Sequence, residues 1–173
     1  MAAGADSVID TDAAKQRARE GVTAAADELI EVSRQIHSNP ELAMEERQAA
    51  ALLADRLEEH GFQVERGASS LETAFLASWG EGPVVIAYLC EYDALPGIGH
   101  ACGHNLIATA GLGAAYGLKA ALAPSQVRLL VAGTPAEENI GGKVIMLERG
   151  AFDGVDVALM AHPSPVDMDM APM

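Results

Sequence analysis

Cysteine and aromatic residues are scarce in this chain of 173 residues. Only two cysteines occur, Cys90 and Cys102, so the dense disulfide framework of a small secreted domain is excluded. Aromatic residues make up 4% of the sequence whereas 50% of it is hydrophobic, which predicts an aliphatic, alanine-rich core. The length suits one domain of ordinary size.

Positive charge is also in short supply. The sequence has 11 Lys and Arg against 25 Asp and Glu, a formal net charge of −14. Nucleic acids and anionic membrane surfaces both require basic patches, so neither is expected as a partner. No apolar run approaches the ~20 residues of a membrane span. Acidic residues at 6, 10 and 12 leave no secretory pattern near the N-terminus, and the sequence therefore predicts a cytoplasmic protein.

Hydrophobic periodicity predicts helices that alternate with strands. Residues 1–12 are small and acidic and are expected to form a disordered end. Helices are expected over 13–38, 44–60, 104–123 and 142–149, and strands over 62–66, 73–79, 83–89, 126–132 and 155–161. This order predicts an α/β fold in which helices flank a sheet.

Metal-ligand residue types follow three of the predicted strands. Cys102 and His104 come after strand 83–89, the pair Glu137 and Glu138 follows strand 126–132, and His162 follows strand 155–161. Ligand sites of α/β sheets collect at the carboxyl ends of strands. Thiolate, imidazole and carboxylate groups are what a zinc-like ion accepts, so the sequence predicts a metal site.

Each of these residues also has a simpler interpretation. A buried cysteine often acts as a small hydrophobe, adjacent carboxylates are often solvated, and a lone histidine is often structural. Their shared placement at strand ends favours the metal site over the separate alternatives. Within the pair, one carboxylate could bind a metal while its neighbour acts on water, because a carboxylate bound tightly to metal is a poor base.

Other residues near the predicted site are expected to have different roles. His100 is a competing ligand or a partner that orients one. Glu91 and Asp93 either orient a ligand or serve the chemistry of a turn. Cys90 is expected to pack in the core. The two remaining histidines, at 37 and 60, are expected to be surface or packing residues.

Five segments resemble the co-catalytic metallopeptidases of the aminoacylase superfamily. They are His37-Ser-Asn-Pro-Glu41, the run from Glu91 to Asn105 (EYDALPGIGHACGHN), Gly133-Thr-Pro-Ala-Glu-Glu138, Gly141-Gly-Lys143 and Met160-Ala-His-Pro163. The order and spacing of these segments are most similar to the amidohydrolase branch that includes hippuricase, indole-acetyl-amino-acid hydrolase and aminobenzoyl-glutamate hydrolase. Asn105 stands where many relatives carry aspartate, a variant similar to the aminobenzoyl-glutamate hydrolase and dipeptidase-like sub-branch.

The resemblance implies a three-layer zinc-peptidase-like fold and a specific division of roles. It implies that Cys102, His104, Glu138 and His162 bind metal and that Glu137 is the general base. It implies two divalent ions, zinc, manganese or cobalt, and hydrolysis of the amide bond of N-acyl amino acids or dipeptides. It also implies a homodimer for a full-length relative.

Length departs from the family pattern, because family members are about twice as long or longer. Residues 13–173 would then be the N-terminal part of the catalytic domain, without the lid or dimerisation domain and the C-terminal part. The expectation is a fragment with weak hydrolase activity or none. The alternative is a non-catalytic metal-binding or interaction fragment. A redox protein is disfavoured because the two cysteines do not form a Cys-x-x-Cys motif, and no phosphate-binding loop supports a nucleotide site.

Overall fold

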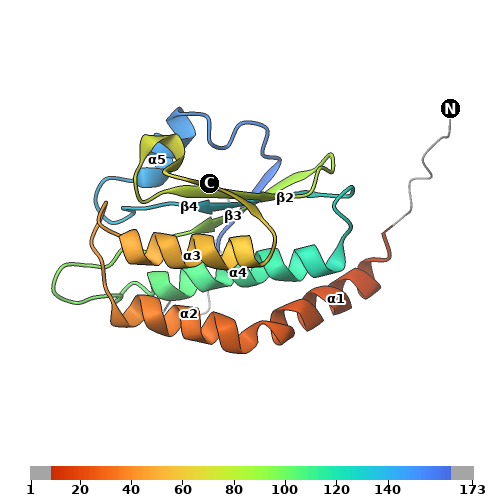
Figure 1. The fold of residues 1–173 in the computed structure, drawn as a ribbon, viewed down its shortest axis with the longest axis horizontal. Helices are drawn as coiled ribbons and strands as arrows, with labels where there is room; N and C mark the ends of the chain where they lie inside the picture. Colours follow the sequence, from red (N-terminus) through yellow and green to blue (C-terminus); the bar gives the residue numbers. More distant parts are fainter. Residues whose placement is uncertain (1–8, 165–173) are drawn as a thin grey trace.

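The computed structural model describes residues 9–164, which form one five-stranded mixed sheet with helices on both faces (Figure 1). The helices are α1 (Thr11–Ala24), α2 (Ala26–Ser38), α3 (Arg47–Glu59), the short 3-10 helix η1 (Ala68–Ser70), α4 (His104–Ala121) and α5 (Gly142–Glu148). The strands are β1 (Gln63–Arg66), β2 (Phe75–Trp79), β3 (Val85–Cys90), β4 (Arg128–Gly133) and β5 (Val157–Leu159).

The sheet has the strand order β1-β2-β4-β3-β5. β1 pairs with β2 and β2 pairs with β4 in antiparallel register, whereas β3 is parallel to both β4 and β5. Tyr88 of β3 lies opposite Val131 of β4 on one side and Leu159 of β5 on the other. Because β4, β3 and β5 are adjacent and parallel, the loops that follow them leave the same edge of the sheet.

The sheet lies between two layers of helices. Figure 1 shows α1 to α4 on one face and α5 on the opposite face. On the α5 side, Met146 packs with Ala132 of β4 and with Ala68 and Ala74. The arrangement confirms the predicted fold class of a sheet flanked by helices.

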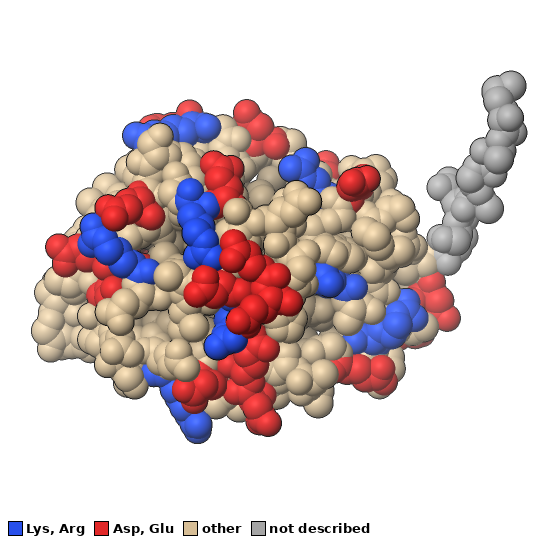
Figure 2. Space-filling view, viewed as in Figure 1, with Lys and Arg blue, Asp and Glu red and all other residues tan. Residues whose placement is uncertain are grey.

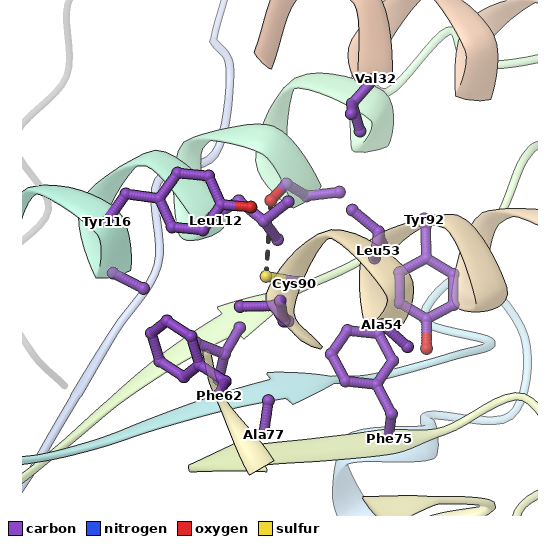
Figure 3. Packing of buried hydrophobic residues seen from close by; sticks show 14 of the residues in the cluster. Val32, Leu53, Ala54, Phe62, Phe75, Ala77, Cys90, Tyr92, Leu112 and Tyr116 are labelled. Carbon is purple, nitrogen blue, oxygen red and sulfur yellow. Dashed lines mark hydrogen bonds between the residues drawn. The ribbon is translucent and has the colours of Figure 1, made fainter. Parts of the chain in front are cut away.

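The main core lies between the sheet and α2, α3 and α4. Leu53, Leu57 and Leu112 are fully buried there, and each such side chain contributes about 1.5–3 kcal/mol of transfer free energy. Figure 3 shows the Cys90 sulfur pointing from β3 toward α4, where the thiol donates a hydrogen bond to the Ala108 carbonyl at 3.5 Å. A Cβ on Gly111 would lie 2.4 Å from this sulfur, so only glycine fits. Burial raises the pKa of Cys90 to about 12, as expected for a packing residue.

The predicted helix 13–38 is wrong as a single element, because the structure divides it at Ala25 into α1 and α2. No proline or glycine marks this position. Both segments contact α4. Gly21 of α1 lies so close to α4 that an added Cβ would come within 2.7 Å of the Ala120 Cβ. Close packing against α4 therefore accompanies the break at Ala25.

The two ends of the chain also differ from the predicted boundaries. α1 begins at Thr11, two residues before the predicted helix, because the Asp10 side chain accepts a hydrogen bond from the Ala13 amide and caps it. Residues 1–8 of the predicted disordered end lie outside the described residues, and so do residues 165–173 at the end of the predicted domain. The predicted strand 155–161 is shorter, since β5 covers only Val157–Leu159, and all three of its residues are exposed.

The surface is predominantly acidic, with arginines placed among the carboxylates. Figure 2 shows acidic side chains gathered around the C-terminal half of α3. Arg66 pairs there with Asp55 and Glu58, and Arg56 pairs with Glu59. Such exposed pairs contribute about 0–1 kcal/mol each. In the described part of the chain, no helix combines the length and apolar character that crossing a membrane requires.

Candidate metal centre

The three loops that follow β3, β4 and β5 bring most of the predicted ligands together. The structure contains two groups of ligand atoms in which every atom lies within 4.8 Å of the others. One group is Cys102, His104 and Glu138, and the other is Glu91, His104 and His162. His104 belongs to both groups and is therefore the centre of the cluster.

Asp93 fixes the orientation of His104. His104 is the first residue of α4 and is buried, and its Nδ1 lies 2.8 Å from Asp93 Oδ1. An imidazole that donates Nδ1–H to a carboxylate keeps a lone pair on Nε2. That Nε2 is buried without a hydrogen-bond partner and lies 3.3 Å from both Glu91 Oε2 and Glu138 Oε1. The arrangement presents a lone pair to a point lined by carboxylates.

The electrostatics of this point favour positive charge. Burial opposes the charged form of His104, but its hydrogen bond to Asp93 and the nearby charges of Asp93 and Glu91 raise its pKa overall. Burial alone would raise the pKa of Asp93, but its hydrogen bond with His104 and the hydrogen bond from the Glu138 amide lower that pKa overall. The His104 shift has the sign that surrounding carboxylates produce, and the Asp93 shift has the sign that the hydrogen bonds it accepts produce.

Asp93 also joins the loops after β3 and β4. Its second oxygen, Oδ2, accepts a hydrogen bond from the Glu138 amide at 3.0 Å. Cys102 lies next to the Glu138 carboxylate, and this contact is the largest cause that raises the pKa of the thiol to about 11. A cation that replaced the thiol proton would therefore be held by sulfur and carboxylate together.

Glu137 and Glu138 point to different neighbours. Glu138 faces His104 and Cys102, whereas Glu137 belongs to neither group of ligand atoms. Its Oε2 lies 2.7 Å from Lys143 Nζ, and the same ammonium pairs with Glu91. Glu137 retains 37% exposure of its side chain and is thus a carboxylate beside the cluster that water can reach.

Known proteins resemble the chain over most of its length. It is 46% identical over 180 residues to the Xaa-Arg dipeptidase of Mus musculus, which covers 93% of this chain and 41% of the relative. It is 38% identical over 165 residues to a p-aminobenzoyl-glutamate hydrolase subunit of Escherichia coli, with 83% and 34% coverage. A dinuclear metal-binding M20-family peptidase from Bacillus subtilis superimposes with a TM-score of 0.67 at 27% identity, over 79% of this chain and 42% of that structure. No protein-family model matches.

The chain belongs to the M20 peptidase family. This membership confirms the resemblance inferred from the five sequence segments, including the dipeptidase and aminobenzoyl-glutamate hydrolase branch. The family and its structural neighbours are hydrolases. The chain spans about two fifths of the length of the curated relatives it matches, 41% for the mouse protein and 34% for the bacterial one.

His162 lies on the solvent-exposed side of the cluster. Its ring is 6.0 Å from that of His104 at an interplanar angle of 86°, and its Nδ1 is 2.8 Å from the Pro163 carbonyl. Gly103 precedes α4 with a φ of +79°, and a Cβ there would lie 2.9 Å from Pro163. This glycine therefore permits both the turn into α4 and the close approach of the segment that carries His162.

The other histidines are not part of either group. His100 is buried with both ring nitrogens lacking a hydrogen-bond partner, and burial lowers its pKa. Its ring lies 6.3 Å from that of His37. His60 stacks on Tyr116 with ring centroids 3.7 Å apart and contacts Glu28, as a packing histidine would.

Two residues that position the site were missed by sequence reasoning. Glu46 is fully buried, and its carboxylate accepts hydrogen bonds from the Ala136 amide at 2.8 Å and the Thr73 hydroxyl at 3.0 Å. Ala136 has a φ of +59°, a left-handed conformation that costs roughly 1–2 kcal/mol for a residue with a Cβ. Glu46 thus fixes the strained residue that precedes Glu137. Lys143 is the second missed residue, and only its place in the Gly-Gly-Lys segment marked it.

Proposed function

We propose that this chain carries the metal-binding and proton-transfer residues of an amidohydrolase or dipeptidase that cleaves N-acyl amino acids or dipeptides. The observation that carries the proposal is the buried Nε2 of His104, which is anchored by Asp93 and faces carboxylates without a hydrogen bond. The names of the relatives, an Xaa-Arg dipeptidase and a p-aminobenzoyl-glutamate hydrolase, support the substrate class.

The residues present fit a divalent cation. Two buried polar atoms of the cluster, His104 Nε2 and Glu91 Oε2, lack hydrogen-bond partners, and unpaired buried polar atoms are costly unless something binds them. Nitrogen, sulfur and carboxylate oxygen together suit zinc, manganese or cobalt. Cys102, His104, Glu138 and His162 would hold the metal, with two ions by analogy with the dinuclear relative. When bound, such ions polarise a carbonyl and favour deprotonation of water.

The protein's own residues supply orientation and proton transfer. Asp93 holds the His104 ring and the Glu138 amide, so the ligands are placed before a substrate arrives. Glu137 accepts the proton of the attacking water and passes it to the leaving amine, because its carboxylate is next to the cluster without being part of it. Lys143 holds that carboxylate by its 2.7 Å ion pair.

Cobalt titration of the purified chain tests the metal site. Binding through Cys102 gives a cobalt–thiolate charge-transfer band, and Cys102→Ala should remove it while His60→Ala should not. A chain without this band would contradict the proposed site.

Hydrolysis is tested separately, with manganese and three substrates: an Xaa-Arg dipeptide, p-aminobenzoyl-glutamate and an N-acyl amino acid. Glu137→Gln should lower any turnover by about 10²–10⁴-fold and leave cobalt binding intact, because it removes only the proton acceptor. Cobalt binding without turnover would favour the non-catalytic metal-binding alternative. A homodimer and a cytoplasmic location stay predictions from the sequence.

A further inference from the structure

Glu91 is a buried carboxylate of which only one oxygen has a partner. It follows β3 directly and its side chain is 1% exposed. Oε1 pairs with Lys143, whereas Oε2 is buried without any hydrogen bond. Asp93, two residues later, differs because one of its oxygens contacts His104 and the other accepts the Glu138 amide. The sequence suggested one orienting role for both residues, but only Asp93 has the contacts of an orienting carboxylate.

The free oxygen of Glu91 lies where a ligand of the same ion as His104 would lie. Glu91 Oε2 and His104 Nε2 are 3.3 Å apart, both are buried, and neither satisfies hydrogen-bond geometry with the other. Two ligands that lie ~2.0–2.2 Å from one zinc-like ion at a tetrahedral angle are about 3.4 Å apart. The observed distance of 3.3 Å therefore matches the separation of two ligand atoms on one ion better than that of a donor and its acceptor.

The neighbouring charges support the same interpretation. Lys143 compensates Oε1 of Glu91 but is shared with Glu137, so Oε2 faces His104 without a cation of its own. Glu138 lies on the other side of the His104 nitrogen at the same distance of 3.3 Å. Several acidic groups with one shared ammonium leave a deficit of positive charge at this point, and a divalent ion would fill it.

We propose that Glu91 is a direct ligand of the cation that His104 binds, with Oε2 as the donor atom and Lys143 holding the other oxygen in place. This inference rests on the proposed function, since it adds a residue to that metal site. It differs from an orienting role because Glu91 would touch the ion itself.

The test is a cobalt titration of Glu91→Gln followed by optical spectroscopy and equilibrium dialysis. Glutamine keeps the shape and removes the charge, so cobalt affinity should fall by more than about 100-fold, beyond the ~10–100-fold that loss of an outer partner costs. The visible d–d bands should change because the ligand set changes, while the Cys102 charge-transfer band persists at saturating cobalt. Glu28→Gln is the control, since it makes the same change at a partly buried glutamate that contacts His60 outside both ligand groups, and it should leave spectrum and affinity unchanged.

Glu91→Asp separates direct binding from a general effect of charge. It keeps the negative charge but withdraws the oxygen from His104, so a direct ligand predicts altered d–d bands and weaker binding, whereas a charge effect alone predicts the parent spectrum. Circular dichroism confirms folding, and Glu91→Asp decides the question if Glu91→Gln does not fold. Parent-like affinity and d–d bands in the folded variant would overturn the inference and leave the metal site standing. A parent chain that shows no charge-transfer band would instead contradict the proposed function.

Discussion

Glu46 and Glu91 are two buried glutamates with opposite surroundings. Both are at most 1% exposed. Glu46 uses both carboxylate oxygens, one for the Ala136 amide and one for the Thr73 hydroxyl. Glu91 uses one oxygen for Lys143 and leaves the other facing His104 without a bond. A buried carboxylate with every oxygen bonded holds the fold, whereas one with an open oxygen indicates where a ligand belongs.

The comparison also explains the arrangement of the loop after β4. Glu46 restrains the Ala136 backbone from α3's side of the molecule, and Lys143 holds the Glu137 carboxylate from α5. Between them, Glu138 is tied to Asp93 through its amide. The contacts of Glu46 and Lys143 on either side of this loop are therefore satisfied, whereas Glu91 Oε2 and His104 Nε2 within the cluster are not.

The largest expected effect is on metal binding by the cluster around His104. His104→Ala removes the residue common to both ligand groups. Structural zinc sites bind with about 10–16 kcal/mol, so one of about four ligands contributes roughly 3–4 kcal/mol, or several hundred-fold in affinity. Equilibrium dialysis with cobalt or zinc measures the loss. His60→Ala is the control because it removes an imidazole that stacks on Tyr116, and equal losses in both variants would argue against a specific site.

The next largest effect is on the stability that the hydrogen bonds of Glu46 provide. Glu46→Ala leaves the Thr73 hydroxyl and the Ala136 amide without their acceptor, at about 1–3 kcal/mol for each buried group. Relief of a buried charge offsets part of this, so we expect a net destabilisation of about 2–4 kcal/mol. Urea unfolding of the metal-free chain measures it. An unchanged midpoint would show that water or a rearranged loop replaces the carboxylate.

Glu91→Gln should change the stability of the metal-free chain by less than about 1 kcal/mol, since Oε2 makes no hydrogen bond that could be lost. Lys143 keeps Glu137 as a partner, and glutamine removes a charge that is only half compensated. The same urea experiment compares it with Glu46→Ala. A loss as large as that of Glu46→Ala would remove the distinction between the two carboxylates.

The sequence predicted the layers of this fold because its elements are separated by clear signals. Nearly continuous apolar runs followed by glycine-containing loops marked the strands that reach the site, and the parallel order of β4, β3 and β5 then follows the rule for α/β sheets. The break at Ala25 was not predicted, because no proline interrupts the helical pattern there. The antiparallel pairing of β1 and β2 also depends on tertiary contacts that no local pattern encodes.

The site was predictable as far as residue type and strand position determine it. Cys102, His104, Glu138 and His162 were expected together on those grounds, and they lie in the two overlapping groups. The different contacts of Glu91 and Asp93 were not predictable, because two acidic residues separated by Tyr92 are similar in sequence and differ only in their neighbours. The buried position of Glu46 was not predictable, because a glutamate near the start of a predicted helix is normally solvated.

The smallest effect is the pH dependence that Glu46 contributes to stability. Burial raises the pKa of its carboxyl above the usual 4.5, and the hydrogen bonds from Ala136 and Thr73 only partly oppose this. The folded state therefore binds this proton more tightly than the unfolded state does. The stabilisation is fully present below the unfolded pKa and is lost as the pH rises through the folded pKa.

The stability of the parent chain relative to Glu46→Gln should consequently fall between about pH 5 and about pH 7, because the variant lacks this titration and other groups cancel in the difference. Urea unfolding of both chains at the two pH values measures the change. A relative stability that rises over this range would mean that the hydrogen bonds outweigh burial and that Glu46 is held as the ionised carboxylate.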